Sequence, residues 1–390
     1  MDLKKVFLIQ EIIPNYRVPV FRRIAQLPNI DLTVFYGDPS RLQANENLRN
    51  ATDLGGFKTI KLEVYETGDA SYRPGFIKHV LRERPDVVVL GGGAHGDILC
   101  TLVLCKLMGI RVLWFLGGVP YINEEQIQAE MQRGRLNGWF GRYNPRRWLM
   151  FQADGMVVYS SHAKAYFAKQ GFPDERIWVA PNSPDTDALL KHEDEIKGHP
   201  EVLQELRKKY APNGERIIFM LGRLNKDRNT DVLLDAFTIV ANSLPDTVLI
   251  LVGDGAERPR LENRVKTEGI RNVHFAGAIY DDAILAKYYL ISDVFVTPGV
   301  ASLAIKIAMT FGIPVVAADY GLEIHAIRDR ENGFIVRMND VRALANKLAT
   351  LLQDNELRTS ISIRARETIR EEINIGRMIE GFRHAICAET

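Results

Sequence analysis

The stretch from Thr297 to Val316 contains residues spaced to bind a phosphate group. Gly299 ends a short apolar run, and Ala301, Ser302 and Leu303 stand where the following helix is expected to begin. Backbone N–H groups at a helix start have no partner inside the helix, and together with the helix dipole they attract anions. The alternative is an ordinary crossover between two strands with no ligand, and this segment alone leaves both interpretations open.

A strand, a glycine turn, a buried helix and a second strand are needed to place those N–H groups. Residues 291–297 predict the first strand, and residues 303–309 suit a buried helix with Lys306 as its one charged position. Gly312 is placed to end that helix in a left-handed turn, and Pro314 opens the next strand.

The same alternation of apolar runs and helical segments extends along the chain. Strands are predicted at 6–9, 31–36, 86–90, 111–115, 155–159 and 177–180, and again at 216–221, 247–252 and 273–276. Several of these runs lead directly into glycines. The pattern is typical of an α/β fold with doubly wound parallel sheets, in which ligands bind outside the carboxyl ends of the strands.

The length of 390 residues predicts two domains rather than one core. The alternation restarts at Arg216 after a charged segment, so we expect an N-terminal domain at residues 1–190 and a second at 191–370. Residues 371–390 have helical spacing suited to packing back on the first domain. The active site is expected in the cleft between the two domains.

Composition excludes several classes of protein. Fifty Lys and Arg against 49 Asp and Glu give no global attraction to nucleic acid. The three cysteines, Cys100, Cys105 and Cys387, lack metal-ligand spacing and suit reduced thiols in a cytosol, and no metal site is predicted. The first apolar run ends at Gln10, too early for a signal peptide, and no uncharged window is long enough to span a membrane. We therefore expect a cytoplasmic protein.

Motifs in the second half occur in the order and spacing of a known enzyme family. They are 222–237, 252–255, 274–277, 292–298, 311–316 and 332–336. This series resembles the signature of the retaining glycosyltransferases of family 4, and an ordered series is more specific than any single motif. The resemblance implies the GT-B fold, with two facing Rossmann-like domains. It also implies metal-independent transfer of a sugar from a nucleotide-diphosphate sugar, with retained configuration and no cofactor.

The resemblance assigns catalytic residues on the donor side. It puts Arg223 on the donor diphosphate, and the family's lysine falls on Arg228, with Lys226 nearby. Negative charge grows on the diphosphate as the sugar leaves, so fixed cations stabilise the transition state. The alternative is that Lys226 and Arg228 are solvated loop charges. The other predicted donor-binding residues are Gly222, Gly253, Gly277, Gly299, Ser302, Leu303 and Glu323.

Two glutamates of the family are absent from this chain. In the family they lie eight residues apart and hold the sugar and the ribose, and here they align with Gly299 and Ile307. Some relatives have a Pro-Gly motif that resembles Pro298-Gly299, but Ile307 still removes a polar contact to ribose. Glu323 is the remaining acid in a family-like position. It either contacts the donor or complements a helix dipole.

The acceptor side is predicted in the first half, where the resemblance is looser. Tyr16 and Arg17 lie in a loop like that of relatives that build bacterial surface glycans. His95 is either a base or ligand partner, or plain polar surface, and the family's first-domain histidine has no clear match. The predicted acceptor-side residues are Tyr16, Arg17, His95, Gly117, Gly118 and Asn182. The predicted acceptor is a glycan or a lipid-linked glycan.

The segment from Arg133 to Trp148 combines five arginines and four aromatic residues without an acid. Such a composition suits peripheral contact with an anionic membrane at the inner face. The alternative is a basic loop that packs on its own domain.

Together these features predict a retaining hexosyltransferase of bacterial surface polysaccharide synthesis. Because the two glutamates are missing, the alternative is a catalytically silent GT-B protein that binds a glycan or activates a partner glycosyltransferase. A phosphorylase would need a cofactor lysine motif that we do not find, and an epimerase would release free nucleotide without an acceptor.

Overall fold

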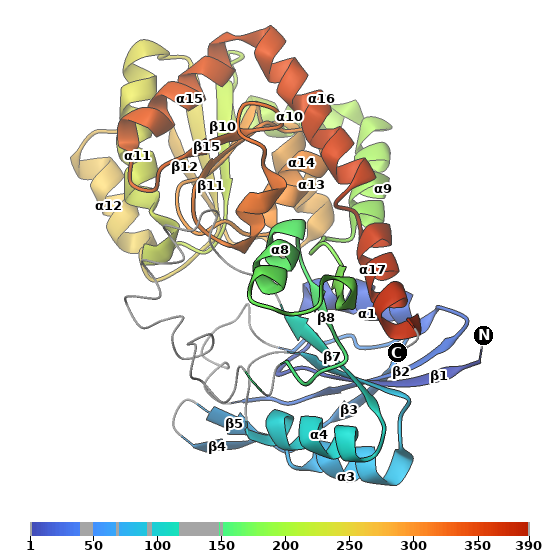
Figure 1. Ribbon diagram of the computed structural model, residues 1–390. Helices are drawn as coiled ribbons and strands as arrows, with labels where there is room; N and C mark the ends of the chain where they lie inside the picture. The colour runs from blue at the N-terminus through green and yellow to red at the C-terminus, as the bar shows by residue number, and fades with distance from the viewer. Residues whose placement is uncertain are drawn as a thin grey trace. The chain divides into compact units, whose positions relative to one another are not determined.

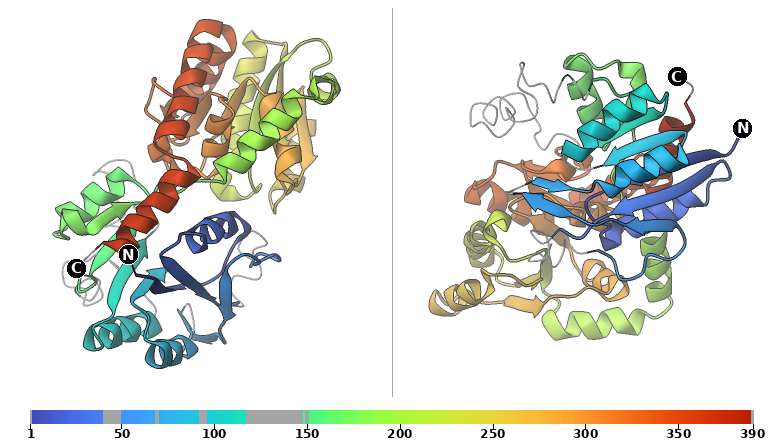
Figure 2. Two further views of the ribbon diagram at one scale, coloured as in Figure 1. Left: turned by 90° about the vertical axis from the view of Figure 1, so that its right-hand side faces the viewer. Right: turned by 90° about the horizontal axis from the view of Figure 1, so that it is seen from below.

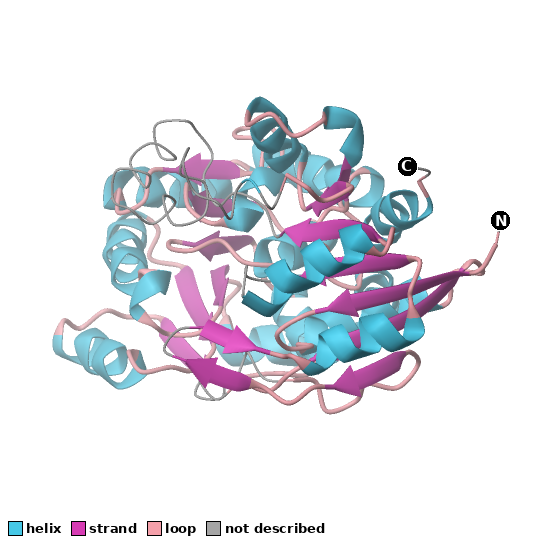
Figure 3. Ribbon diagram, turned by 60° about the horizontal axis from the view of Figure 1, so that its bottom comes forward, coloured by secondary structure: helices cyan, strands magenta, loops and turns pink. Residues whose placement is uncertain are grey.

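The computed structural model describes residues 2–39, 50–67, 70–91, 96–116, 148 and 151–388. These residues form two compact units, each considered by itself. Unit 1 contains the described residues up to Asn182 and those from Ile375 onward, and unit 2 contains Ser183–Asn374. Strands and helices alternate through both units, and the helices lie over the sheets (Figure 3).

Unit 1 is built on a parallel sheet with the strand order β3-β2-β1-β6-β7-β8-β9. Its strands are β1 (Lys4–Ile9), β2 (Ile30–Tyr36), β3 (Lys58–Lys61), β6 (Val87–Gly91), β7 (Arg111–Leu116), β8 (Gly155–Val158) and β9 (Ile177–Val179). A separate antiparallel pair is formed by β4 (Tyr65–Thr67) and β5 (Ala70–Tyr72). The helices are η1 (Asn15–Arg17), α1 (Val18–Ala25), α3 (Gly75–Glu83), α4 (Gly96–Leu107), α8 (Ser161–Lys169), η3 (Asp174–Arg176) and α17 (Ile375–Cys387).

Alternation along β1 explains how helices cover both faces of this sheet. Val6 and Leu8 pack in one cluster with α1 and the C-terminal helix α17. Phe7 points to the opposite face, where its ring lies 4.8 Å from Phe35 and 6.5 Å from Phe76 of α3. Because successive side chains of a strand point to opposite faces, an apolar run such as β1 must be covered on both.

Unit 2 is built on a second parallel sheet, with the order β12-β11-β10-β13-β14-β15. Figure 1 labels β10, β11, β12 and β15 of this sheet. Its strands are β10 (Arg216–Leu221), β11 (Thr247–Val252), β12 (Val273–Gly277), β13 (Val294–Thr297), β14 (Val315–Ala318) and β15 (Phe334–Val336). Its helices are α9 (Thr186–Lys197), α10 (Pro200–Tyr210), η4 (Lys226–Arg228), α11 (Thr230–Ser243), α12 (Arg258–Thr267), α13 (Asp282–Leu290), α14 (Ala304–Thr310), η5 (Leu322–Ala326), α15 (Val341–Gln353) and α16 (Asn355–Glu371).

The central strand β10 divides the core of unit 2 in the same way. Phe219 packs edge-on against Tyr289 of α13, with ring centroids 4.9 Å apart. Ile218 and Met220 face the other cluster, with Phe237 of α11. The prediction of α/β architecture with parallel sheets is confirmed. Along the described residues, no helix has both the length and the apolar character that crossing a bilayer requires.

Helix α17 belongs to unit 1 although the chain reaches it from unit 2. Phe382 packs edge-on against Phe115 of β7. A Cβ atom on Gly381 would lie 2.3 Å from the carbonyl oxygen of Val179, so glycine permits the close approach of α17 to β9. The Arg111 guanidinium donates to the Ala385 carbonyl oxygen at 2.7 Å, which supplies a partner for the helix end.

Candidate functional site

The predicted donor-side residues follow the carboxyl ends of neighbouring strands in unit 2. From β10 the strand order runs through β11 to β12 on one side and through β13 to β15 on the other. This reversal is a topological switch point, where parallel α/β sheets bind ligands. Arg223 and Arg228 follow β10, and residues 299–303 follow β13, so two adjacent loops flank the switch point.

These two loops are joined by direct hydrogen bonds. The Val300 N–H donates to the Asp227 carbonyl oxygen at 3.1 Å. In return, Nη1 of Arg228 donates to the Val300 carbonyl oxygen at 2.6 Å. A Cβ atom on Gly299 would lie 2.2 Å from the Asp227 carbonyl oxygen, so a residue with a side chain does not fit between the loops. The structure therefore brings Arg228 and the Gly299 turn together.

The Arg228 guanidinium is a largely buried cation with unused donor capacity. Its side chain is 21% exposed, and its ion pair with Asp227 spans 4.0 Å. Nε is buried and has no hydrogen-bond partner among the described residues. Burial lowers the pKa of Arg228, Asp227 partly offsets this, and the like charge of Arg223 lowers the pKa further. An anion placed beside both arginines would relieve this repulsion.

Of the backbone N–H groups after Gly299, some donate hydrogen bonds to backbone carbonyls of the protein and others do not. Ala301 was expected to direct its N–H at a ligand, but it donates to the Tyr320 carbonyl oxygen at 2.8 Å. No backbone carbonyl in the described ranges accepts from the N–H groups of Ser302 or Leu303. Since α14 has seven residues, its dipole is short, and the arginines are the main source of positive charge.

Of the predicted glycines Gly222, Gly253 and Gly277, it is Gly253 whose lack of a side chain lets neighbouring strand ends lie close together. Gly253 has φ 143°, and a Cβ atom there would lie 1.9 Å from the carbonyl oxygen of Gly222. The Gly253 N–H donates to the Gly277 carbonyl oxygen at 2.8 Å. Backbone packing is therefore sufficient to explain glycine at Gly253, while donor contacts of all three remain predictions.

Glu323 forms a buried ion pair with Lys306. Lys306 Nζ lies 2.5 Å from Glu323 Oε2, and both side chains are almost fully buried. The lysine comes from α14 and the glutamate from the first turn of η5, so the pair links the segments that follow β13 and β14. Glu323 thus compensates a buried lysine, and its predicted contact with a donor remains a prediction.

Asn229 is a positioning residue that the sequence analysis missed. It adopts a left-handed conformation with φ 51° between η4 and α11. Its amide donates to the Asn339 side-chain oxygen at 3.1 Å and lies 3.5 Å from the Pro298 carbonyl oxygen. Asparagine tolerates the left-handed conformation better than most residues. An asparagine directly before the predicted helix was therefore the sequence signal from which this turn could have been predicted. In the same loop, Arg223 is partly exposed and Lys226 is exposed.

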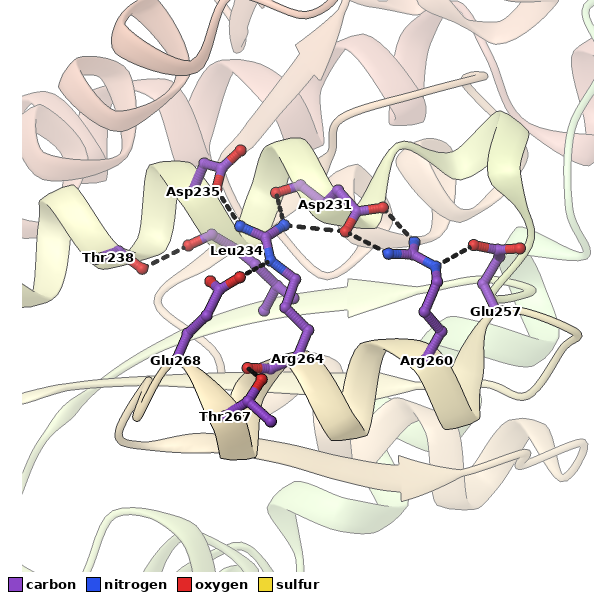
Figure 4. Close-up of polar contacts among 9 residues, drawn as sticks. All are labelled: Asp231, Leu234, Asp235, Thr238, Glu257, Arg260, Arg264, Thr267 and Glu268. Atoms are coloured by element: carbon purple, nitrogen blue, oxygen red, sulfur yellow. Dashed lines mark hydrogen bonds and ion pairs between the residues drawn. The ribbon is translucent and has the colours of Figure 1, made fainter.

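An ion-pair network holds α11 against α12 (Figure 4). Arg264 of α12 bonds Asp231 at 2.9 Å, Glu268 at 2.9 Å and also Asp235. Arg260 contacts the same Asp231, and its hydrogen bonds are the largest cause of the lowered pKa of Asp231. Because α11 begins directly after Arg228 and Asn229, the network steadies the loop that carries Arg228.

Arg17 in unit 1 is buried and engaged in packing. Its guanidinium donates to the Tyr159 hydroxyl, lies 4.0 Å from the Met378 sulfur and stacks near the ring of Phe115. These contacts hold α17 on the sheet. Tyr16 is exposed beside it. The acceptor-side roles of Tyr16 and Arg17 remain predictions.

Of the other predicted acceptor-side residues, only Asn182 lies within the described part of the chain. Asn182 is buried at the last residue of unit 1. His95, Gly117, Gly118 and the basic segment from Arg133 lie outside the described residues, except for Trp148, which is exposed. Within the described ranges, no group of three or more His, Cys, Asp or Glu side chains is placed to hold a metal ion.

Two family models match successive parts of the chain. Residues 23–188 match the model described as Glycosyltransferase Family 4, and residues 203–368 match the model described as Glycosyl transferases group 1. The chain belongs to the family 4 glycosyltransferases. The family predicted from the sequence motifs is confirmed.

Sequence relatives of this glycosyltransferase cover part of its length. It is 33% identical to phosphatidyl-myo-inositol mannosyltransferase of Mycobacterium leprae over 167 residues, 41% of this chain and 43% of that protein. It is 28% identical to an uncharacterized glycosyltransferase of Haemophilus influenzae over 182 residues, 45% of this chain and 50% of that protein. The chain thus spans about half the length of the curated relatives it matches.

The fold of this glycosyltransferase is found among solved structures. HepE from Anabaena in complex with UDP matches with a TM-score of 0.70 and 17% identity, over 98% of this chain and 99% of that chain. At this identity the likeness shows the fold alone. The fold is GT-B, with two Rossmann-like domains.

Proposed function

We propose that this protein is a retaining, metal-independent hexosyltransferase. It moves a sugar from a nucleotide-diphosphate sugar to a glycan or lipid-linked acceptor, in the synthesis of bacterial surface polysaccharide. The observation that carries the proposal is the Arg228 guanidinium. It is largely buried, it is hydrogen-bonded to the turn after Gly299, and its Nε has no hydrogen-bond partner among the described residues.

The arrangement suits a diphosphate leaving group. As the bond from the anomeric carbon to the diphosphate oxygen breaks, the electron pair stays on that oxygen and its negative charge grows. Arg223 lies close enough to Arg228 to lower its pKa, so one diphosphate beside them would meet both cations. The N–H groups of Ser302 and Leu303 are further donors of the same turn. The leaving phosphate can take the acceptor's proton, so no protein base is required.

The relatives support the substrate classes. The Mycobacterium leprae relative is named as a mannosyltransferase that acts on phosphatidyl-myo-inositol, which is a lipid acceptor. The Anabaena structure contains UDP, the nucleoside diphosphate that remains after a sugar is transferred from a UDP-sugar. We place the enzyme in the cytoplasm at the inner face of the membrane, with the segment from Arg133 to Trp148 as one predicted contact. Exchanging Arg146 and Arg147 for Glu should reduce co-sedimentation with anionic vesicles.

A catalytically silent protein that binds a glycan or activates a partner glycosyltransferase is the second candidate. It is favoured by Gly299 and Ile307, which stand where the family has two glutamates, and by the ion pair that occupies Glu323. These residues leave the sugar and the ribose without the family's carboxylate contacts.

Two experiments distinguish the candidates. A thermal-shift screen against UDP, GDP, ADP and their sugars should raise the Tm with one nucleotide series, because a ligand stabilises the state that binds it. Turnover of the matching donor is then measured for wild type and Arg223→Ala. We expect the rate to fall more than about tenfold, since losing a contact to developing charge costs roughly 3 kcal/mol. Binding without turnover of any donor would favour the silent protein, and wild-type rates in Arg223→Ala would remove that residue from the mechanism.

A further inference from the structure

Helix α4 presents apolar side chains on the face that points away from its own sheet. Leu102 and Cys105 are buried against the unit 1 core, whereas Val103 is 46% exposed and Leu107 is 82% exposed. Residues three or four apart lie on one side of a helix, so Cys100, Val103 and Leu107 form one outward stripe. A surface helix normally carries polar residues there. On α4 the charged Lys106, which is 43% exposed, lies beside the stripe three residues after Val103.

Helix α3 extends this stripe and adds positive charge. It lies beside α4 over the same face of the sheet (Figures 1 and 2). Leu81 is half exposed. Lys78, three residues before it, and Arg82, four residues after Lys78, are exposed as well. Arg84 follows the helix and is also exposed. The α3–α4 surface, defined by Lys78, Leu81, Arg82, Val103 and Leu107, therefore combines leucine and valine with basic groups.

Among the described side chains, the carboxylates beside this surface each contact a basic side chain or a backbone donor. Glu83 lies 2.9 Å from Lys5, and hydrogen bonds first from His79 and then from Lys5 lower its pKa to about 2. Asp154 lies 2.6 Å from Lys106 of α4. Glu83 also lies 3.3 Å from Arg82, and the exposed Asp86 accepts a hydrogen bond from the Lys5 N–H at 2.7 Å. Within the described part of the chain, the basic residues Lys5, Lys78, Arg82, Arg84 and Lys106 still outnumber the acids Glu83, Asp86 and Asp154, so the surface carries an excess of positive charge.

We propose that the α3–α4 surface docks on an anionic lipid bilayer. Leucine and valine side chains enter the boundary between headgroups and acyl chains, while lysine and arginine extend their charged ends to lipid phosphates. A second copy of the chain is a poorer occupant, because a two-fold contact would oppose the same basic groups. A nucleic acid would leave the apolar stripe uncovered. The inference depends on α3 and α4 alone and not on the proposed donor chemistry.

The test is co-sedimentation of the full chain with lipid vesicles, in the absence of nucleotide sugar. Vesicles of phosphatidylcholine with phosphatidylglycerol are compared with vesicles of phosphatidylcholine alone, at low and high salt. One variant combines Val103→Ser with Leu107→Ser, and a second combines Lys78→Glu with Arg82→Glu. The matched controls are Ile363→Ser on α16, where Ile363 is 53% exposed, and Arg330→Glu, whose side chain is 77% exposed against 75% for Arg82.

We expect salt-sensitive binding to the anionic vesicles, loss of about tenfold or more in both surface variants, and wild-type binding in both controls. Equal binding to the two kinds of vesicle, absent binding, or unchanged binding of the surface variants would overturn the proposal. A concentration-dependent dimer that the Val103→Ser and Leu107→Ser variant dissociates would make a second copy the occupant instead. None of these outcomes bears on donor binding, which the thermal-shift screen measures separately.

Discussion

Replacing Gly299 by alanine should disturb the candidate site through backbone packing alone. The added Cβ atom would lie 2.2 Å from the Asp227 carbonyl oxygen and 2.6 Å from the carbonyl carbon of Arg228. Non-bonded heavy atoms prefer about 3.5 Å, so the loops after β10 and β13 must separate by about 1 Å. Overpacking of this kind costs about 1–3 kcal/mol of unfolding free energy. A displacement of about 1 Å at Arg228 lowers the transfer rate on the order of 100-fold.

The assay compares Tm and kcat for wild type and Gly299→Ala, with the preferred nucleotide sugar as donor. Gly222→Ala is the control for stability in the neighbouring loop, because its Cβ atom would come no closer than 3.8 Å to another residue. The control should keep the wild-type Tm while Gly299→Ala loses Tm and kcat together. If Gly299→Ala keeps both, the close contact between the loops does not position Arg228.

Three further predictions follow from named contacts. Lys306→Met removes the cation that faces the buried Glu323 and should cost about 3–5 kcal/mol in urea unfolding, whereas adding Glu323→Leu should restore most of that loss. If the double variant is the less stable of the two, the pair stabilises the fold by itself. Asn229→Gly keeps the left-handed conformation but removes the amide, so KM for the donor should rise with little change in Tm. A change in Tm alone would make Asn229 purely structural. The pKa of Glu83 is lowered to about 2, so its ion pairs stabilise the fold above about pH 4.5 and lose that effect as the pH falls toward 2. Glu83→Gln should therefore destabilise the protein at neutral pH more than at about pH 3, and equal effects at both would contradict this.

The central strands could be predicted from the sequence because strands buried on both faces consist of continuous runs of apolar residues. The run 216–221 became β10 and 247–252 became β11, each covered on both faces. The edge strand β3 was missed because Lys58 and Lys61 break the apolar run, and β15 was missed because three residues carry little pattern. Edge strands need less apolar surface, so their sequences resemble loops.

The candidate site was predicted in part. The ordered motifs located Arg228 and Gly299, but their contact depends on residues 71 positions apart in the chain, which spacing cannot reveal. Lys306 was noticed in the sequence because it is the one charged residue of an otherwise apolar helix. Its ion-pair partner Glu323 lies beyond the next strand, so the sequence did not predict the pair. Arg17 was assigned to the acceptor because its loop resembles that of relatives, while the structure shows its guanidinium packed against α17. Side-chain burial of a long cation is set by tertiary packing and leaves no local pattern.

The central claim is that Arg228 holds the diphosphate of the donor. Titration calorimetry with the nucleoside diphosphate selected by the thermal-shift screen, and with the corresponding nucleoside, tests this claim most directly in wild type and Arg228→Ala. Hydrogen bonds to charged groups contribute about 1.5–3 kcal/mol, so the diphosphate affinity should fall about 10- to 150-fold while the nucleoside affinity stays unchanged. Equal diphosphate affinity in the two proteins would contradict the account.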